Sequence, residues 1–154
     1  MIEPFPPGEG LAINRVFQAP RERVWREFTM PEAFADWFGG TQSEVPVESV
    51  TFDATPGSVW KATMFIGPKH SEKHWEGEFV EVREPERLVF TVTDEPGGGE
   101  YELVTVELTD LGDGRTEMQM TQTGGHLPPE GYDRAKSGWG AFFDRMAERL
   151  AAAG

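Results

Sequence analysis

Three histidines and the acidic residues near them are the side chains of this chain that could carry metal or acid–base chemistry. His70, Glu72, His74 and Glu76 alternate along one segment, and two imidazoles with two carboxylates could hold zinc. Their spacing and context do not match a closed zinc site, so we predict a solvated hairpin, no metal and no cofactor. The chain has no cysteine, which excludes a thiol nucleophile and a disulfide framework.

His126 and Gln122 are the remaining candidates for chemistry. His126 precedes a predicted C-terminal helix and could act as a general base, but no carboxylate at an informative spacing supports it. Gln122 is predicted to face inward from a strand, where it could orient a ligand carbonyl or hydroxyl, or simply bond to backbone. No nucleophile elbow is present, and Gly97-Gly98-Gly99 lacks the lysine and helix of a phosphate loop. We therefore assign no catalytic residue.

The element that must position these groups is a predicted helix over residues 129–153. Its apolar residues recur at steps of three and four and form one stripe: Tyr132, Ala135, Trp139, Phe142, Phe143, Met146 and Leu150. Gly138 and Gly140 flank Trp139, and each should cost the helix about 1 kcal/mol against alanine. They indicate either close packing of a neighbouring element, which we favour, or room for a ligand beside the stripe.

Most of the remaining chain alternates with a period of two. We predict strands at 11–17, 45–53, 57–66, 74–84, 87–94, 101–110 and 115–123, joined by short turns rich in glycine and proline. Two short helices follow the first strand, with Val24, Trp25 and Phe28 on the first and Phe34, Trp37 and Phe38 on the second. This order predicts an α+β fold in which a curved antiparallel sheet of about seven strands wraps the C-terminal helix. Residues 11–153 form one domain after a loose lead-in at 1–10.

Composition limits the partners. The net charge of −13 argues against nucleic acid and against an anionic membrane. The chain has no run of eighteen apolar residues and no visible secretory signal, so we expect a cytoplasmic protein.

Several segments, in order, resemble one known superfamily. They are residues 17–25 (FQAPRERVW), 31–37 (PEAFADW), 77–90 (GEFVEVREPERLVF) and 116–124, followed by Gly138-Trp139. Together they resemble the START-like, or SRPBCC, superfamily with its helix-grip fold, and most closely the branch similar to the activator of Hsp90 ATPase. The resemblance covers residues 11–151. Gln122 departs from it, because relatives often carry histidine there, and this weakens any catalytic role carried over to that position.

The resemblance implies a cavity between the sheet and the long helix that holds a small apolar or aromatic molecule. On the inward faces, large soft side chains could line such a cavity or simply fill the core. The predicted ligand-binding residues are Trp37, Phe38, Trp60, Met64, Trp75, Phe79, Phe90, Met118, Met120, Gln122, His126, Trp139 and Phe143.

Two alternatives stay open. The first is an enzyme of the polyketide cyclase or aromatase kind, which needs an acid or base facing the cavity, and His126, Tyr132 and Gln122 are its candidates. The second is a protein-interaction module like the Hsp90 activator, with a protein partner or a second copy of the chain as the binding partner. Fold alone does not decide among the three, so the site must be argued from its residues.

Overall fold

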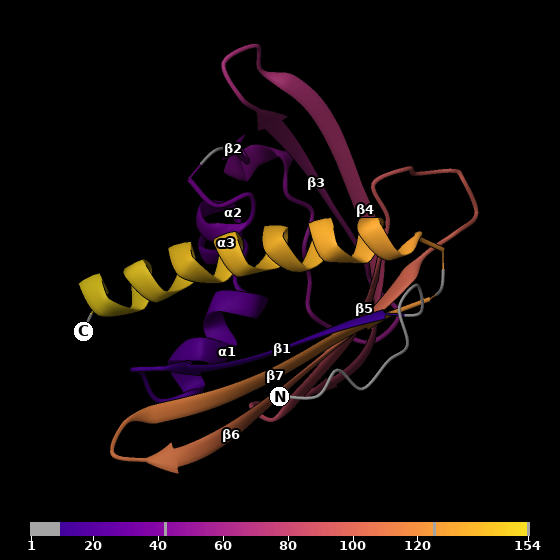
Figure 1. The fold of residues 1–154 in the computed structure, drawn as a ribbon. Helices are drawn as coiled ribbons and strands as arrows, with labels where there is room; N and C mark the ends of the chain where they lie inside the picture. Colours follow the sequence, from indigo (N-terminus) through magenta and orange to yellow (C-terminus); the bar gives the residue numbers. More distant parts are fainter. Residues whose placement is uncertain (1–9, 42, 125, 154) are drawn as a thin grey trace.

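The computed structural model describes residues 10–41, 43–124 and 126–153. Along the chain the elements are β1 (Gly10–Phe17), α1 (Arg21–Thr29), α2 (Pro31–Trp37), β2 (Ser43–Glu44), the 3-10 turn η1 (Val47–Ser49), β3 (Val59–Ile66), β4 (Ser71–Arg83), β5 (Arg87–Val92), β6 (Glu102–Gly112), β7 (Arg115–Thr123) and α3 (Pro129–Ala153). The strands form one seven-stranded antiparallel sheet in the order β1-β7-β6-β5-β4-β3-β2. Figure 1 shows α3 crossing the concave side of the sheet, with α1 and α2 beside its C-terminal half. The predicted helix-grip fold is confirmed.

The period-two pattern places the inner face of the sheet correctly. Its inward residues are buried from β3 to β7: Trp60, Ala62, Met64, Phe79, Leu88, Phe90, Val92, Val104, Val106, Leu108, Met118, Met120 and Gln122. On α3 the stripe residues Trp139 and Phe143 face them, and their rings stack with centroids 5.7 Å apart. Burial of these large apolar surfaces against one another holds the helix in the sheet.

Gly77 on β4 lies opposite Trp60 of β3, where neighbouring groups approach its backbone closely. The Trp60 indole Nε1 donates a hydrogen bond to the Thr91 carbonyl oxygen, at 2.9 Å, directly over Gly77. A Cβ at Gly77 would lie 1.7 Å from the Thr91 oxygen and 2.3 Å from the Trp60 nitrogen. Only glycine leaves room for the indole and the carbonyl oxygen at this position.

The predicted strand at 45–53 is wrong. The short strand β2 ends at Glu44, and residues 45–53 form only the turn η1 and a single bridge between Thr51 and Lys61. Pro46 has no N–H for a strand ladder, and its carbonyl oxygen instead accepts hydrogen bonds from the Ser49 backbone at 3.0 Å and from the Ser49 hydroxyl at 2.7 Å. This local turn competes successfully with strand pairing.

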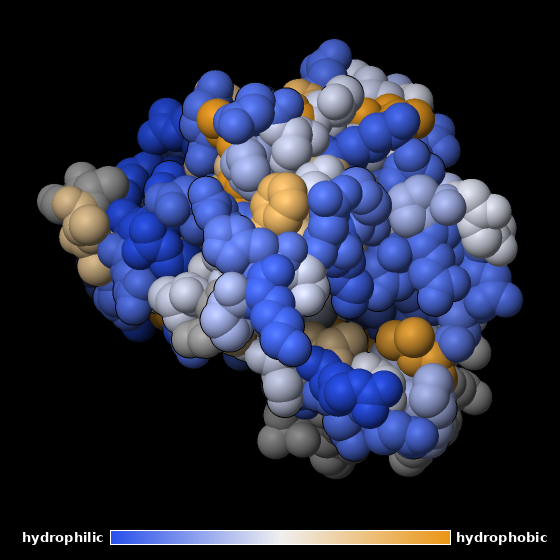
Figure 2. All heavy atoms as spheres, turned by 90° about the horizontal axis from the view of Figure 1, so that it is seen from above, coloured by the Kyte–Doolittle hydropathy of each residue, from blue (hydrophilic) through white to orange (hydrophobic). Residues whose placement is uncertain are grey.

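One face of the molecule is mainly hydrophilic (Figure 2). Figure 2 shows one face on which apolar residues appear only as small separate patches among polar ones. None of the helices in the described part of the chain is long and apolar enough to cross a membrane.

Candidate functional site

A cavity of about 650 Å³ lies between the curved sheet and the N-terminal half of α3. The residues that line it come from every layer of the fold: Phe38, Ser43, Met64, Ile66, Lys73, Trp75, Val92, Thr93, Asp94, Glu95, Glu100, Glu102, Gln122, His126, Leu127, Gly131, Arg134, Ala135, Gly138, Trp139 and Phe142. Its volume falls in the range of pockets that take small organic molecules.

Aromatic and aliphatic side chains form most of the inner wall. Phe38 sits at its centre, with ring centroids 5.3 Å from Trp75, 6.1 Å from Trp139 and 5.1 Å from Phe142. Met64 is fully buried beside them. These flat and polarisable groups offer an apolar ligand broad contact. The indole Nε1 of Trp75 is buried and has no hydrogen-bond partner among the described residues.

One end of the cavity carries a chain of hydrogen bonds. The Trp139 indole Nε1 donates to Gln122 Oε1 at 2.8 Å, and Gln122 Nε2 donates to Glu102 Oε1 at 3.3 Å. The second carboxylate oxygen, Glu102 Oε2, lies 2.8 Å from His126 Nδ1. Glu102 and Gln122 are only 7% and 5% exposed, so these bonds hold them in fixed positions.

Gly124 leaves the space that the carboxylate and the imidazole occupy. A Cβ at this position would lie 2.0 Å from Glu102 Oε2 and 2.9 Å from His126 Nδ1. The backbone of the chain is therefore shaped around the Glu102–His126 pair, and a side chain at Gly124 would displace it.

The rim of the cavity is charged. Lys73 pairs with Asp94 at 3.0 Å and lies 5.1 Å from the centre of the Trp75 ring. Glu100 and the exposed Arg134 complete the entrance. The entrance is therefore polar, whereas the interior that would contact an apolar ligand is aromatic and aliphatic.

Of the thirteen predicted ligand-binding residues, the structure brings six to this cavity: Phe38, Met64, Trp75, Gln122, His126 and Trp139. The other seven are packed in the core and do not line it: Trp37, Trp60, Phe79, Phe90, Met118, Met120 and Phe143. Tyr132, a candidate acid or base, is also buried away from the cavity wall. The two alternatives for the soft side chains, core and cavity, therefore apply to different residues.

Gly138 lies in the cavity wall, on the same side of α3 as Arg134, Ala135 and Phe142. A Cβ built on it would meet nothing within 4 Å. The close packing predicted for Gly138 and Gly140 is therefore wrong, because a Cβ at Gly140 would likewise meet nothing within 4 Å. The absent side chain leaves open space next to Trp139.

The model of the family described as activator of Hsp90 ATPase homolog 1-like protein matches residues 18–151. The chain belongs to this family. Its membership agrees with the START-like superfamily indicated by the sequence motifs. A comparison with curated proteins found no match.

Solved structures share the fold of this family member. A protein from Chromobacterium violaceum aligns with a TM-score of 0.80 and 24% identity, covering 92% of this chain and 96% of that one. The AHSA1 protein from Silicibacter pomeroyi aligns with a TM-score of 0.82 and 19% identity, covering 94% and 99%. A protein from Nitrosomonas europaea aligns with a TM-score of 0.79 and 22% identity, covering 97% and 98%. At these identities the likeness establishes the fold alone.

Glu102 is the site residue of this family member that sequence reasoning missed. It stands on the same strand parity as the inward residues Val104 and Val106, so the alternation already indicated that its side chain faces the interior. Its partner His126 is 24 residues away, and no local spacing joins the two. The pairing arises because β6 and β7 are neighbours and α3 follows β7 directly.

The histidine cluster of the sequence lies outside the cavity. His74 Nε2 pairs with Glu72 at 2.7 Å on the surface, whereas Glu76 accepts from the Tyr101 hydroxyl at 3.2 Å. The described residues contain no group of three or more side chains that could hold a metal ion.

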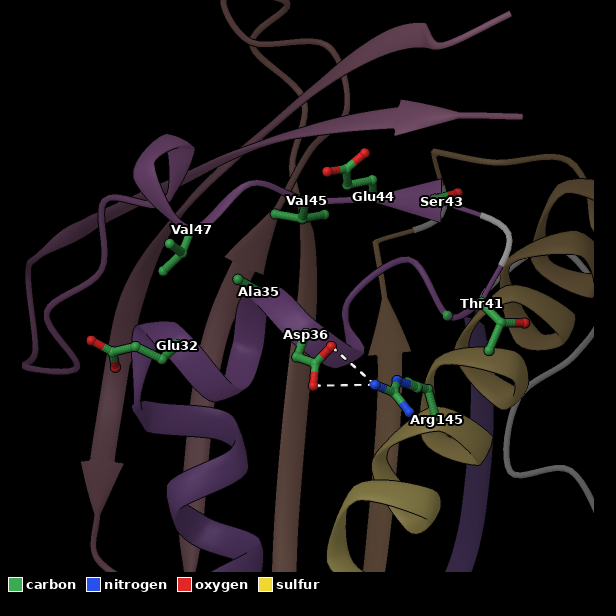
Figure 3. Close-up of a pocket in the computed structure, with 10 residues that line it drawn as sticks. Glu32, Ala35, Asp36, Thr41, Ser43, Glu44, Val45, Val47 and Arg145 are labelled. Atoms are coloured by element: carbon green, nitrogen blue, oxygen red, sulfur yellow. Dashed lines mark hydrogen bonds and ion pairs between the residues drawn. The ribbon is translucent and has the colours of Figure 1, made fainter. Parts of the chain in front are cut away.

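A second hollow of about 490 Å³ lies between α2, the segment around β2 and α3. Figure 3 shows the Asp36 carboxylate pointing across it to the Arg145 guanidinium, which donates at 3.1 and 3.2 Å. Arg149 also donates to Asp36 and holds the buried Glu27 with two bonds, at 2.8 and 3.2 Å. Partial burial raises the pKa of Asp36, but its bonds to Arg145 and Arg149 outweigh this and leave the pKa below its ordinary value. These ion pairs attach α1 and α2 to α3.

Proposed function

We propose that this protein binds a small apolar or aromatic molecule that carries one polar group, in the cavity between the sheet and α3. The observation that carries the proposal is the 650 Å³ cavity with an aromatic wall and a hydrogen-bonding end formed by Glu102, Gln122 and His126. The family and its superfamily commonly bind hydrophobic ligands, which supports the same conclusion. Apolar contact would supply most of the binding free energy, at about 25 cal/mol per Å² of buried surface.

The polar end sets the orientation of the ligand. Gln122 Nε2 has two N–H groups, and one of them is used on Glu102. The other has no hydrogen-bond partner among the described residues, and we expect it to donate to a carbonyl or hydroxyl oxygen of the ligand, because Gln122 lines the cavity. A ligand with an oxygen at one end and an apolar or aromatic body therefore complements the site.

A titration with a neutral aromatic dye, N-phenyl-1-naphthylamine, tests this proposal. Trp75 and Trp139 line the cavity, so binding should quench tryptophan fluorescence with a saturable curve. The apparent Kd should change little with salt, since no ion pair with the ligand is proposed. Native mass spectrometry of freshly purified protein would report any apolar molecule that copurifies.

Two variants test whether the quenching of tryptophan fluorescence comes from the cavity. Trp75→Phe should reduce the quenching, whereas Trp25→Phe, a change in the core outside the cavity, should leave it in place. Unsaturable quenching, or equal loss in both variants, would contradict binding at this cavity.

A further inference from the structure

We infer that the Glu102–His126 pair is a general-base centre, and that the protein removes a proton from its ligand. The inference rests on the proposed function, because the base acts on the molecule that the cavity binds. It extends that function from binding to reaction. The observations that carry it are the geometry of the pair, its burial and its position in the cavity wall.

The pair has the arrangement that makes an imidazole an oriented base. Glu102 Oε2 lies 2.8 Å from His126 Nδ1, so an ionised carboxylate fixes the neutral tautomer with its proton on Nδ1. The lone pair then lies on Nε2, which has no hydrogen-bond partner among the described residues. The carboxylate would also stabilise the imidazolium that forms when Nε2 takes up a proton.

The carboxylate itself is held by the surrounding structure. Gln122 donates to its other oxygen at 3.3 Å, and Trp139 fixes Gln122 in turn at 2.8 Å. The backbone N–H of His126 adds a further donor at 3.4 Å. Gly124 provides the space for the pair, since any Cβ there would meet Glu102 Oε2 at 2.0 Å. Such a set of supporting contacts is typical of a site that must keep one geometry.

The surface pair Glu72–His74 differs from the Glu102–His126 pair in exposure and in its position relative to the cavity. There the imidazole and the carboxylate lie 2.7 Å apart, but both side chains are more than half exposed and neither residue lines the cavity. In the Glu102–His126 pair the side chains are 9% and 34% exposed. A base in a partly dry cavity next to an apolar binding surface can act on a bound organic molecule.

The chemistry fits an apolar carbonyl compound with an acidic hydrogen on the carbon beside the carbonyl. His126 Nε2 takes that proton, the C–H electron pair forms a new C=C bond, and the C=O pair moves onto oxygen. The second N–H of Gln122 Nε2, which is not bonded to Glu102, can donate to the resulting enolate oxygen. Return of the proton to another atom of the ligand completes an isomerisation, so no oxidant, reductant or further reactant is needed.

The elimination of 5-nitro-1,2-benzisoxazole tests the base directly. This neutral aromatic compound loses its C3 proton to a base, the C–H electron pair becomes the third bond of a nitrile, and the N–O bond breaks to release a coloured phenolate. Wild-type protein should accelerate this reaction beyond an equal concentration of 4-methylimidazole, with kcat/KM lowered about a hundredfold in His126→Gln. His74→Gln, which removes the surface pair, should match wild type.

Glu102 acts through His126, so its test separates kcat from KM. Glu102→Gln should lower kcat at least tenfold and leave KM within a factor of two, and Glu102→Asp should recover part of the loss. Gly124→Ala should have the effect of Glu102→Gln, because its Cβ displaces the carboxylate.

Equal kcat/KM in wild type and His126→Gln would overturn the inference, whatever the affinity of the probe. A kcat that falls as much in His74→Gln as in His126→Gln would overturn it as well. Dye binding is measured separately with N-phenyl-1-naphthylamine. If the wild-type protein binds the dye but does not transfer the proton, the proposed function stands and only this inference fails. If the wild-type protein does not bind the dye, the proposed function is refuted.

Discussion

Gly138 offers the most direct control over the cavity. Leucine at this position would extend from α3 into open space, since a Cβ there meets nothing within 4 Å and the residue lines the cavity. Gly140 is the matched control, because its Cβ also meets nothing within 4 Å but it is not part of the cavity wall. We expect Gly138→Leu to block ligand binding and Gly140→Leu to leave it unchanged.

The expected changes in stability and in Kd follow from the places of the two glycines in the helix and at the cavity. Glycine is about 0.8 kcal/mol worse than leucine in a helix interior, so both variants should gain stability of this order and unfold about 2–3 °C higher. The four side-chain carbons of leucine would displace about as many ligand carbons, each worth about 0.8 kcal/mol. The sum of about 3 kcal/mol corresponds to a rise in Kd of roughly a hundredfold for Gly138→Leu alone.

Thermal unfolding followed by circular dichroism measures the first effect, and titration of N-phenyl-1-naphthylamine measures the second. The two variants should therefore agree in melting temperature and differ in Kd. The same Kd for both, with both folded, would show that the ligand does not occupy the space beside Gly138, and the reasoning about this glycine would fail.

Three further predictions concern the core and the ion pairs. Phe143→Ala removes a fully buried ring and should lower the unfolding free energy, measured by urea titration, by about 3–5 kcal/mol. Phe142→Ala, at the cavity wall, should lower it clearly less. Equal losses would contradict the division between core and cavity. Arg149→Met should destabilise by about 3 kcal/mol or more, because it leaves the carboxylate of Glu27 buried without its partner, and a loss below 1 kcal/mol would count against this. Because the pKa of Asp36 is lowered in the folded state, its carboxylate stabilises the fold at pH values above 3.8, the ordinary pKa, and this contribution disappears as the pH falls through the folded-state pKa. The difference in unfolding free energy between wild type and Asp36→Asn should therefore shrink from pH 6 to pH 3. A difference that stays constant over this range would refute the prediction.

Local patterns in the sequence were enough to predict most of the fold. Period two identifies the inner face of five strands, and the three-and-four spacing of apolar residues identifies α3 between the same bounds, 129–153. The strand predicted at 45–53 fails at Pro46, where a local turn replaces ladder bonds. The sequence motifs also indicated the family to which the chain belongs.

The sequence did not determine which inward side chains would pack and which would border empty space. Trp60 and Trp75 both face inward from adjacent strands, yet the first is buried in the core and the second lies in the cavity wall. Likewise Glu102 and His126 carry no common motif and meet only because β6, β7 and α3 are neighbours in space. Alternation fixes the direction of a side chain, whereas cavities and long-range pairs depend on sheet curvature and strand order, which arise from contacts distant in sequence.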